Sequence, residues 1–383
     1  MNPAIVIMAY NRPKSLQRLL ASIAIAHYPD EINIPLVISL DKSDSLEVKH
    51  IAEGFEWQFG EKEIIAHEER LGLMAHFLYC GGLSEKHESI IFLEDDFYIS
   101  PAFYKYAQQA LDYYIDAEEI ALLPLYALQL NGFTHQPFQP ILDSADVFFA
   151  QVGWFKGVAV TAQQWNNFIE WLENKPTGFD PSIPQIWAVL GPEEWFPLFS
   201  SYLVDTQRYF VFPRQSLITD FSDAGMHFEE ETNLYQTNLL LESKVFNFQK
   251  LGESLAVYDA FLELLPECIN HLKPELAEYD YVVDLNASKQ AHQLDAEYVI
   301  TARPTRKTIM EFSTRMKPTE ANVLHNIEGK GIVLTKTNDL RWDRRAEWKI
   351  KVQRYRAGQL ATGLSEHIRL WFLARLDDLG LLG

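Results

Sequence analysis

The segment Ile90-Ile91-Phe92-Leu93-Glu94-Asp95-Asp96 decides the fold that we expect for this chain. Four apolar residues followed directly by three carboxylates predict a short buried strand that ends in an acidic cluster. Such a cluster is costly to bury unless a cation gathers it. Open α/β sheets bind ligands at the carboxyl ends of their strands, and carboxylate oxygens suit Mg²⁺ or Mn²⁺. The simpler alternative is an acidic turn at the start of the next helix.

Strand and helix patterns alternate on both sides of this segment. The expected strands cover residues 5–8, 36–40, 63–66 and 90–93, and the expected helices cover 15–25, 73–86 and a stretch from Pro101 onward. This alternation is typical of a mostly parallel sheet with helices on its faces. The predicted fold class is therefore α/β, with a Rossmann-like central sheet.

Polar residues also follow the first two expected strands. The first strand leads into Ala9-Tyr10-Asn11-Arg12-Pro13, and the second ends at Asp41. The Arg12 guanidinium could bind a diphosphate and Tyr10 a base, although Asn and Pro are equally common in ordinary turns. The loop has no glycine-rich phosphate cradle, which disfavours dinucleotide enzymes, P-loop ATPases and nucleotidyltransferases.

The composition of the 383 residues excludes several classes of function. There are 33 basic and 53 acidic residues, for a net charge of −20, so nucleic-acid binding is not expected. A nucleotide phosphate could still bind an acidic protein through a divalent cation. The two cysteines form no disulfide framework, and no apolar run reaches the roughly 20 residues of a membrane span. Since the start also lacks a signal-peptide pattern, we expect a cytoplasmic protein.

Three domains are expected. An α/β domain covers residues 1–245, a small α/β accessory domain covers 246–340, and a basic helical tail covers 341–383. Within the accessory domain, the apolar spacing predicts a helix over residues 256–265. Strands are expected over 281–285, 298–301 and 331–334.

The tail differs from the rest of the chain in its charge. It holds nine Lys or Arg and five acids, so it carries +4 while the remainder carries −24. Aromatic residues are interleaved with the basic ones. Such a helix can lie on an anionic membrane, where a lipid-linked acceptor would be found, or it can dock onto the acidic body or a partner subunit of a homo-oligomer. The sequence leaves both alternatives open.

Taken in order, these motifs resemble the GT-A glycosyltransferases that use nucleotide-activated sugars. Within that group the chain looks like the Golgi N-acetylglucosaminyltransferases that initiate complex N-glycans, and like their bacterial relatives in surface-polysaccharide synthesis. The resemblance covers roughly residues 4–230. It rests on the stretches 5–12, 36–41, 91–96 with 100–103, 213–216 and 221–228.

The resemblance implies roles for the acidic and nucleotide-side residues. Asp96, the last acid of the triplet, would ligate Mn²⁺ or Mg²⁺, while Asp95 and Glu94 would contact the ribose and the donor sugar. Asp41 falls where the family contacts the base. Arg70 lies where related enzymes place a basic or amide residue near the nucleotide.

Two further roles follow from the same resemblance. Inverting transfer needs a general base that deprotonates the acceptor hydroxyl, and the family's base lies in an acidic pair before a tryptophan. The nearest match here is Glu193-Glu194-Trp195, with Glu194 as the base and Glu193 next; the family has Asp there. The alternative is a solvated turn in which only Trp195 is buried. His227 would face the metal or the diphosphate, or else be an ordinary surface or core residue.

The expected function is therefore a metal-dependent glycosyltransferase. It would move a sugar from a nucleoside-diphosphate donor, most simply a UDP-sugar, to a glycan or lipid-linked glycan in surface-polysaccharide biosynthesis, with inversion. The alternatives are a catalytically silent nucleotide- or glycan-binding module and a nucleotidyltransferase.

Overall fold

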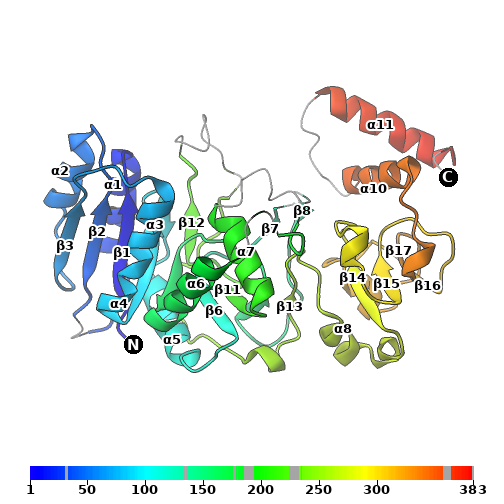
Figure 1. Cartoon of the computed structure of the whole chain (residues 1–383), viewed down its shortest axis with the longest axis horizontal. Helices are drawn as coiled ribbons and strands as arrows, with labels where there is room; N and C mark the ends of the chain where they lie inside the picture. The colour runs from blue at the N-terminus through cyan, green and yellow to red at the C-terminus, as the bar shows by residue number, and fades with distance from the viewer. Residues whose placement is uncertain are drawn as a thin grey trace. The chain divides into compact units, whose positions relative to one another are not determined.

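The computed structural model describes residues 1–30, 33–132, 134, 136–175, 178, 180–184, 194–223, 233, 235–356 and 364–381. The chain forms two compact units (Figure 1). The first unit consists of Met1–Leu128, Ser144–Asp180 and Ala188–Gly252. The second consists of Gln129–Asp143, Pro181–Trp187 and Glu253–Gly383.

A mostly parallel sheet forms the centre of the first unit. Its neighbouring strands follow the order β9-β11-β6-β10-β4-β1-β2-β3. Their bounds are β1 (Ala4–Ala9), β2 (Leu36–Leu40), β3 (Lys62–Ala66), β4 (Ser89–Glu94), β6 (Ile120–Pro124), β9 (Val147–Ala150), β10 (Val158–Thr161) and β11 (Tyr209–Pro213). β4, β1, β2 and β3 run parallel, whereas β10 is antiparallel to β4 and β6. This confirms the predicted α/β class.

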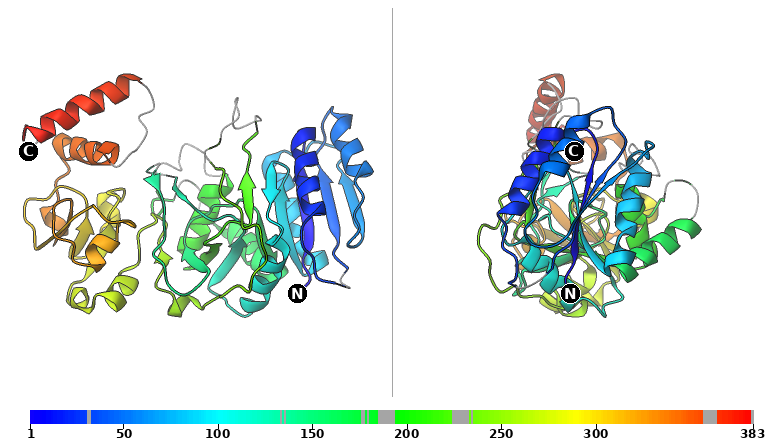
Figure 2. Two further views of the ribbon diagram at one scale, coloured as in Figure 1. Left: turned by 180° about the vertical axis from the view of Figure 1, so that it is seen from behind. Right: turned by 90° about the vertical axis from the view of Figure 1, so that its left-hand side faces the viewer.

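Helices cover both faces of this sheet. α1 and α2 pack together on one face, and α3 and α6 pack together on the other (Figure 2). Every residue of β1 and β2 is buried, as is usual for strands of a parallel sheet that helices cover on both sides. The helices are α1 (Pro13–Ala24), α2 (Leu46–Gly54), α3 (Leu73–Gly82), α4 (Ser84–His87), α5 (Phe103–Tyr113), α6 (Ala162–Asn174) and α7 (Trp195–Asp205). A short antiparallel pair, β5 (Phe97–Ile99) with β12 (Ile218–Asp220), follows the acidic triplet.

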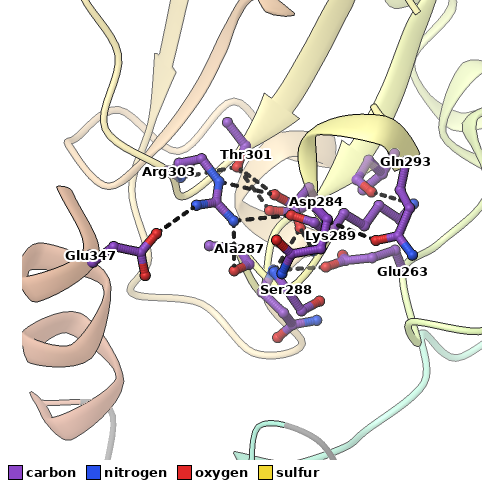
Figure 3. Close-up of polar contacts among 12 residues, drawn as sticks. Glu263, Asp284, Ala287, Ser288, Lys289, Gln293, Thr301, Arg303 and Glu347 are labelled. Atoms are coloured by element: carbon purple, nitrogen blue, oxygen red, sulfur yellow. Dashed lines mark hydrogen bonds and ion pairs between the residues drawn. The ribbon is translucent and has the colours of Figure 1, made fainter. Parts of the chain in front are cut away.

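The second unit has its own sheet, in the order β14-β15-β17-β16. Its elements are β7 (Leu130–Asn131), β8 (Gln136–Pro137), β13 (Val257–Tyr258), α8 (Pro266–Leu272), β14 (Tyr281–Asp284), β15 (Tyr298–Thr301), β16 (Met310–Phe312), α9 (Ala321–Leu324), β17 (Ile332–Lys336), α10 (Arg344–Arg356) and α11 (Leu364–Asp378). β14 and β15 are parallel, and buried ionic side chains gather at their carboxyl ends (Figure 3).

The helix expected over residues 256–265 is wrong. Val257 and Tyr258 form a strand, and the Asp259 carboxylate then accepts hydrogen bonds from the backbone N–H groups of Phe261 and Glu263, which closes a turn. Leu262 has a φ of 55°, which a helix does not allow. Nearly all apolar residues of this segment are buried in the core. Their helix-like spacing therefore does not mark the buried face of a helix.

Candidate functional site

The strand register brings the predicted polar segments to one edge of the first sheet. In the parallel pairs, Ala9 lies opposite Leu40 and Met8 lies opposite Glu94. The residues that follow β1, β2 and β4 therefore leave the sheet side by side. This edge is where open α/β sheets bind their ligands. Asp41 donates its backbone N–H to the carbonyl of buried Ala9 at 3.0 Å, which joins the ends of β1 and β2.

Arg12 joins the first loop to the acidic triplet. Its Nη1 lies 2.7 Å from Asp96 Oδ2, and its Nη2 forms an ion pair with Asp95 Oδ1. Burial raises the pKa values of both aspartates, and the guanidinium opposes that rise by stabilising their charged forms. Asp95 is only 2% exposed, so its carboxylate is shielded from water, while the Arg12 side chain is partly exposed. Asn11, between Tyr10 and Arg12, is exposed.

Two charged residues that sequence analysis missed complete this cluster. Lys156, just before antiparallel β10, forms an ion pair with Asp220 at the end of β12. Both residues act on the charge of Glu94 in the acidic triplet. Burial raises the pKa of Glu94 and Asp96 raises it further, while Lys156 opposes the rise and Asp220 adds to it. A lysine and an aspartate so distant from the triplet in sequence carry no local signal. Only the pairing of β10 with β4 and of β12 with β5 brings them there.

Asp41 organises the turn that leads into α3. Its Oδ1 accepts the Leu71 N–H at 2.8 Å and its Oδ2 accepts the Gly72 N–H at 3.0 Å. Although burial acts to raise the pKa of Asp41, these N–H groups lower it overall. In the same turn, the Arg70 guanidinium lies 5.1 Å from the centre of the Tyr10 ring. Two residues expected near the nucleotide are thus in contact with each other.

A further ion pair lies near the start of α1. Asp223 pairs with Arg18 and accepts a hydrogen bond from Ser15 Oγ at 2.6 Å. The hydroxyl and the guanidinium lower the pKa of Asp223, although burial opposes them. His227, expected to face the metal or the diphosphate, lies outside the described residues, as does Glu193.

Glu194 immediately precedes α7. It is half-buried, and its side chain does not cap the helix. The neighbouring Trp195 is 6% exposed, and its ring centre lies 4.7 Å from that of Phe77 on α3. Because α3 begins at the turn held by Asp41, the packing of Trp195 ties the position of Glu194 to that turn.

The described residues contain no group of three or more His, Cys, Asp or Glu side chains arranged to hold a metal alone. The cluster nevertheless contains more acidic than basic side chains, so its charge is compatible with a bound cation. Glu94, Asp95, Asp96 and Asp220 are four carboxylates set against two cations, Arg12 and Lys156. Hard divalent cations are often held by one or two carboxylates together with substrate phosphates, so the donor chemistry fits such an ion.

The fold and these contacts together define an α/β protein with a cluster of charged side chains at the carboxyl edge of a parallel sheet, the edge at which open α/β sheets bind ligands. No known protein family profile matches the chain. No curated protein matches it either. Solved structures do match, among them three glycosyltransferases.

Three of these structures illustrate the likeness. TarS residues 1–349 from S. aureus shares 12% identity over 57% of this chain and 60% of its own, with a TM-score of 0.36. GalNAc-T7, solved with UDP, GalNAc and Mn²⁺, shares 14% identity over 56% of this chain and 43% of its own, with a TM-score of 0.39. The mannosyltransferase PcManGT from Pyrobaculum calidifontis, solved with GDP-Man and Mn²⁺, shares 13% identity over 59% of this chain and 59% of its own, with a TM-score of 0.37. The chain spans 43–60% of the length of these three solved chains.

Proposed function

We propose that this chain is a glycosyltransferase that takes a sugar from a nucleoside-diphosphate donor. The observation that carries the proposal is the Arg12 guanidinium held between Asp95 and Asp96 at the edge shared by β1 and β4. A diphosphate needs cationic donors of this kind, and guanidinium forks match phosphate oxygens. The resemblance of the sequence motifs to GT-A enzymes points to the same donor class.

A divalent cation, Mn²⁺ or Mg²⁺, fits the proposal. Asp96 would ligate it, because this carboxylate belongs to a cluster in which four acids face two cationic side chains. Such an ion would stabilise the negative charge that develops on the departing diphosphate. Asp95 and Glu94 would contact the ribose and the donor sugar, as the resemblance implies. His227 is proposed to complete the site from a segment outside the described residues.

The remaining side chains bind and orient the substrates. Arg12 binds the diphosphate, and the contact between Tyr10 and Arg70 offers a cationic and aromatic surface to the base. Asp41 holds the turn on which Arg70 lies and is the further candidate for a contact with the base. Glu194 accepts the proton of the acceptor hydroxyl as the glycosidic bond forms, with Glu193 as the second candidate.

The finer assignment rests on the sequence resemblance alone. It comprises a UDP-sugar, a glycan or lipid-linked glycan acceptor, inversion at the anomeric carbon and a role in surface-polysaccharide biosynthesis. Retention would require a different arrangement of nucleophile and base, so the anomeric configuration of the product tests the inversion directly.

The decisive experiment measures nucleotide release from a panel of nucleotide sugars with and without Mn²⁺. We expect nucleoside diphosphate to be released by the wild type and lost in Asp96→Ala, while exposed Asp44→Ala behaves like the wild type. Formation of pyrophosphate would instead identify a nucleotidyltransferase. Tight nucleotide binding without release of diphosphate from any donor would identify a binding module.

A further inference from the structure

The last two helices form a hairpin with a small core of its own. α10 and α11 pack around Val352, Leu370 and Leu373, and Trp348, Tyr355 and Ala374 pack against these residues. The apolar contacts of α11 with α10 are therefore made by one side of the helix. The other side of α11 needs a separate explanation.

That other side is apolar and exposed. Ile368, Phe372 and Leu376 are spaced four residues apart, so they form a stripe along α11, and Phe372 is 58% exposed. Trp371 lies beside the stripe with 46% of its surface exposed. Leu379 and Leu381 continue the apolar surface beyond the end of the helix. An apolar and aromatic surface of this extent usually marks a site of interaction.

Basic side chains border the stripe. Arg375 lies on the same face, three residues beyond Phe372, and its guanidinium carbon is 5.4 Å from the centre of the Trp371 ring. Arg369 is also exposed on α11. Arg344, Arg345 and Lys351 are exposed on the described part of α10. Residues 341–383 together carry +4 in a chain of −20, with Glu366, Asp377 and Asp378 of α11 included in that sum.

We propose that this hairpin docks the protein on an anionic lipid surface. The exposed stripe of α11 enters the boundary between headgroups and acyl chains, while the arginines beside it pair with lipid phosphates. No helix among the described residues is long and apolar enough to cross a bilayer, so the contact is with the membrane surface. The proposal does not depend on the transferase activity.

Charge argues for a lipid surface over a second copy of this chain. Two copies joined through their hairpins would each bring a segment of +4 to the interface, in which Glu366, Asp377 and Asp378 of α11 offset only part of the basic charge. An anionic surface pairs with Arg369 and Arg375.

The test uses the full-length protein and vesicles of one part phosphatidylglycerol to two parts phosphatidylcholine. We expect co-sedimentation that weakens with salt and is lost on vesicles of phosphatidylcholine alone. Arg369→Gln with Arg375→Gln should lower the partition coefficient about fivefold for each arginine. Trp371→Ser with Phe372→Ser should lower it more than about tenfold.

Two control variants match these changes. Leu142→Ser with Val245→Ser removes other highly exposed apolar side chains, and Lys307→Gln with Lys330→Gln removes other exposed charges of the second unit. Both should bind like the wild type, and circular dichroism should show that every variant keeps its helices. Absence of co-sedimentation, or equal binding by the stripe variant, would overturn the proposal. A dimer in analytical ultracentrifugation that Trp371→Ser with Phe372→Ser dissociates would assign the stripe to a second copy instead.

Discussion

Arg12 Nη1 lies 2.7 Å from Asp96 Oδ2, so the side chain proposed to bind a diphosphate and the one proposed to ligate a metal form a single ion pair. The same guanidinium also pairs with the buried Asp95. Arg12 supplies positive charge to these two aspartates. A bound cation and a bound diphosphate would together replace both halves of this pair.

Replacing Arg12 with Ala should therefore destabilise the ligand-free protein and increase its response to metal. Breaking a buried pair by removing one partner typically costs about 3 kcal/mol or more. Because the aspartates then lack their cationic partner, Mn²⁺ should raise the melting temperature of Arg12→Ala more than that of the wild type. Differential scanning fluorimetry with and without Mn²⁺ measures both effects.

Lys14→Ala is the matched control, since Lys14 is an exposed cation two residues further along. It should leave both the melting temperature and the metal response unchanged. The double variant Arg12→Ala with Asp96→Asn should lose the added response to Mn²⁺. If the double variant responds as strongly as Arg12→Ala, Asp96 is not the ligand.

The parallel half of the sheet and its polar edge were predictable from sequence. The runs that form β1, β2 and β4 are short, mostly apolar and almost entirely buried. Their last residues are followed by Tyr10-Asn11-Arg12, by Asp41 and by Asp95-Asp96. Parallel strands have their carboxyl ends at the same edge of the sheet, so local sequence patterns were enough to predict that these residues lie close together.

The other half of the site was not predictable, because it depends on pairing between distant segments. Lys156 and Asp220 reach the acidic triplet only through the antiparallel contacts of β10 and β12. The bonds of Asp41 to the turn at Leu71 and Gly72 are another such case, since a backbone N–H leaves no mark in the sequence. The exposed stripe of α11 likewise emerged only when the partners of Leu370 and Leu373 were known.

Glu194→Gln should abolish sugar transfer while leaving donor binding intact. Gln keeps the size of the side chain but cannot accept the proton of an acceptor hydroxyl, so kcat should fall by about a hundredfold or more. Glu173→Gln, at an exposed position on α6, is the control and should turn over normally. Donor binding is measured by calorimetry with the nucleoside diphosphate. Normal turnover by Glu194→Gln would show that Glu194 is not the base and would leave Glu193 as the candidate.

His76 should make the stability of the protein depend on pH. Its Nε2 lies 2.8 Å from Ser39 Oγ, and burial lowers its pKa to about 4 although Asp41 attracts its charged form. An unfolded chain protonates this histidine below about pH 6.5, whereas the folded protein does so only near pH 4. The folded state binds fewer protons in that window, so its stability falls as the pH drops.

The expected loss from this histidine is about 2 kcal/mol between pH 7 and pH 5. Urea denaturation at the two pH values measures it. The amide of His76→Gln can still hydrogen-bond to Ser39. Between pH 7 and pH 5 the free energy of unfolding of this variant should fall by about 2 kcal/mol less than that of the wild type. His50→Gln, at an exposed site on α2, should keep the full dependence. Equal pH dependence in His76→Gln and the wild type would contradict the assignment.

The ionic cluster of the second unit should be necessary for its sheet. Asp284 ends β14 fully buried, accepts the Ser288 and Lys289 N–H groups, and lies 3.8 Å from the Arg303 guanidinium (Figure 3). Asp284→Ala leaves buried donors unsatisfied and a buried cation less compensated, so it should cost about 3 kcal/mol or more.

Because the cluster lies within the second unit, the loss of stability should be local. Hydrogen exchange should become faster for amides of β14 and β15 in Asp284→Ala, while amides of β1 and β2 keep their protection. Asp280→Ala, at an exposed position just before β14, is the control and should exchange like the wild type. Equal acceleration in the first sheet would instead mean that the two units unfold together.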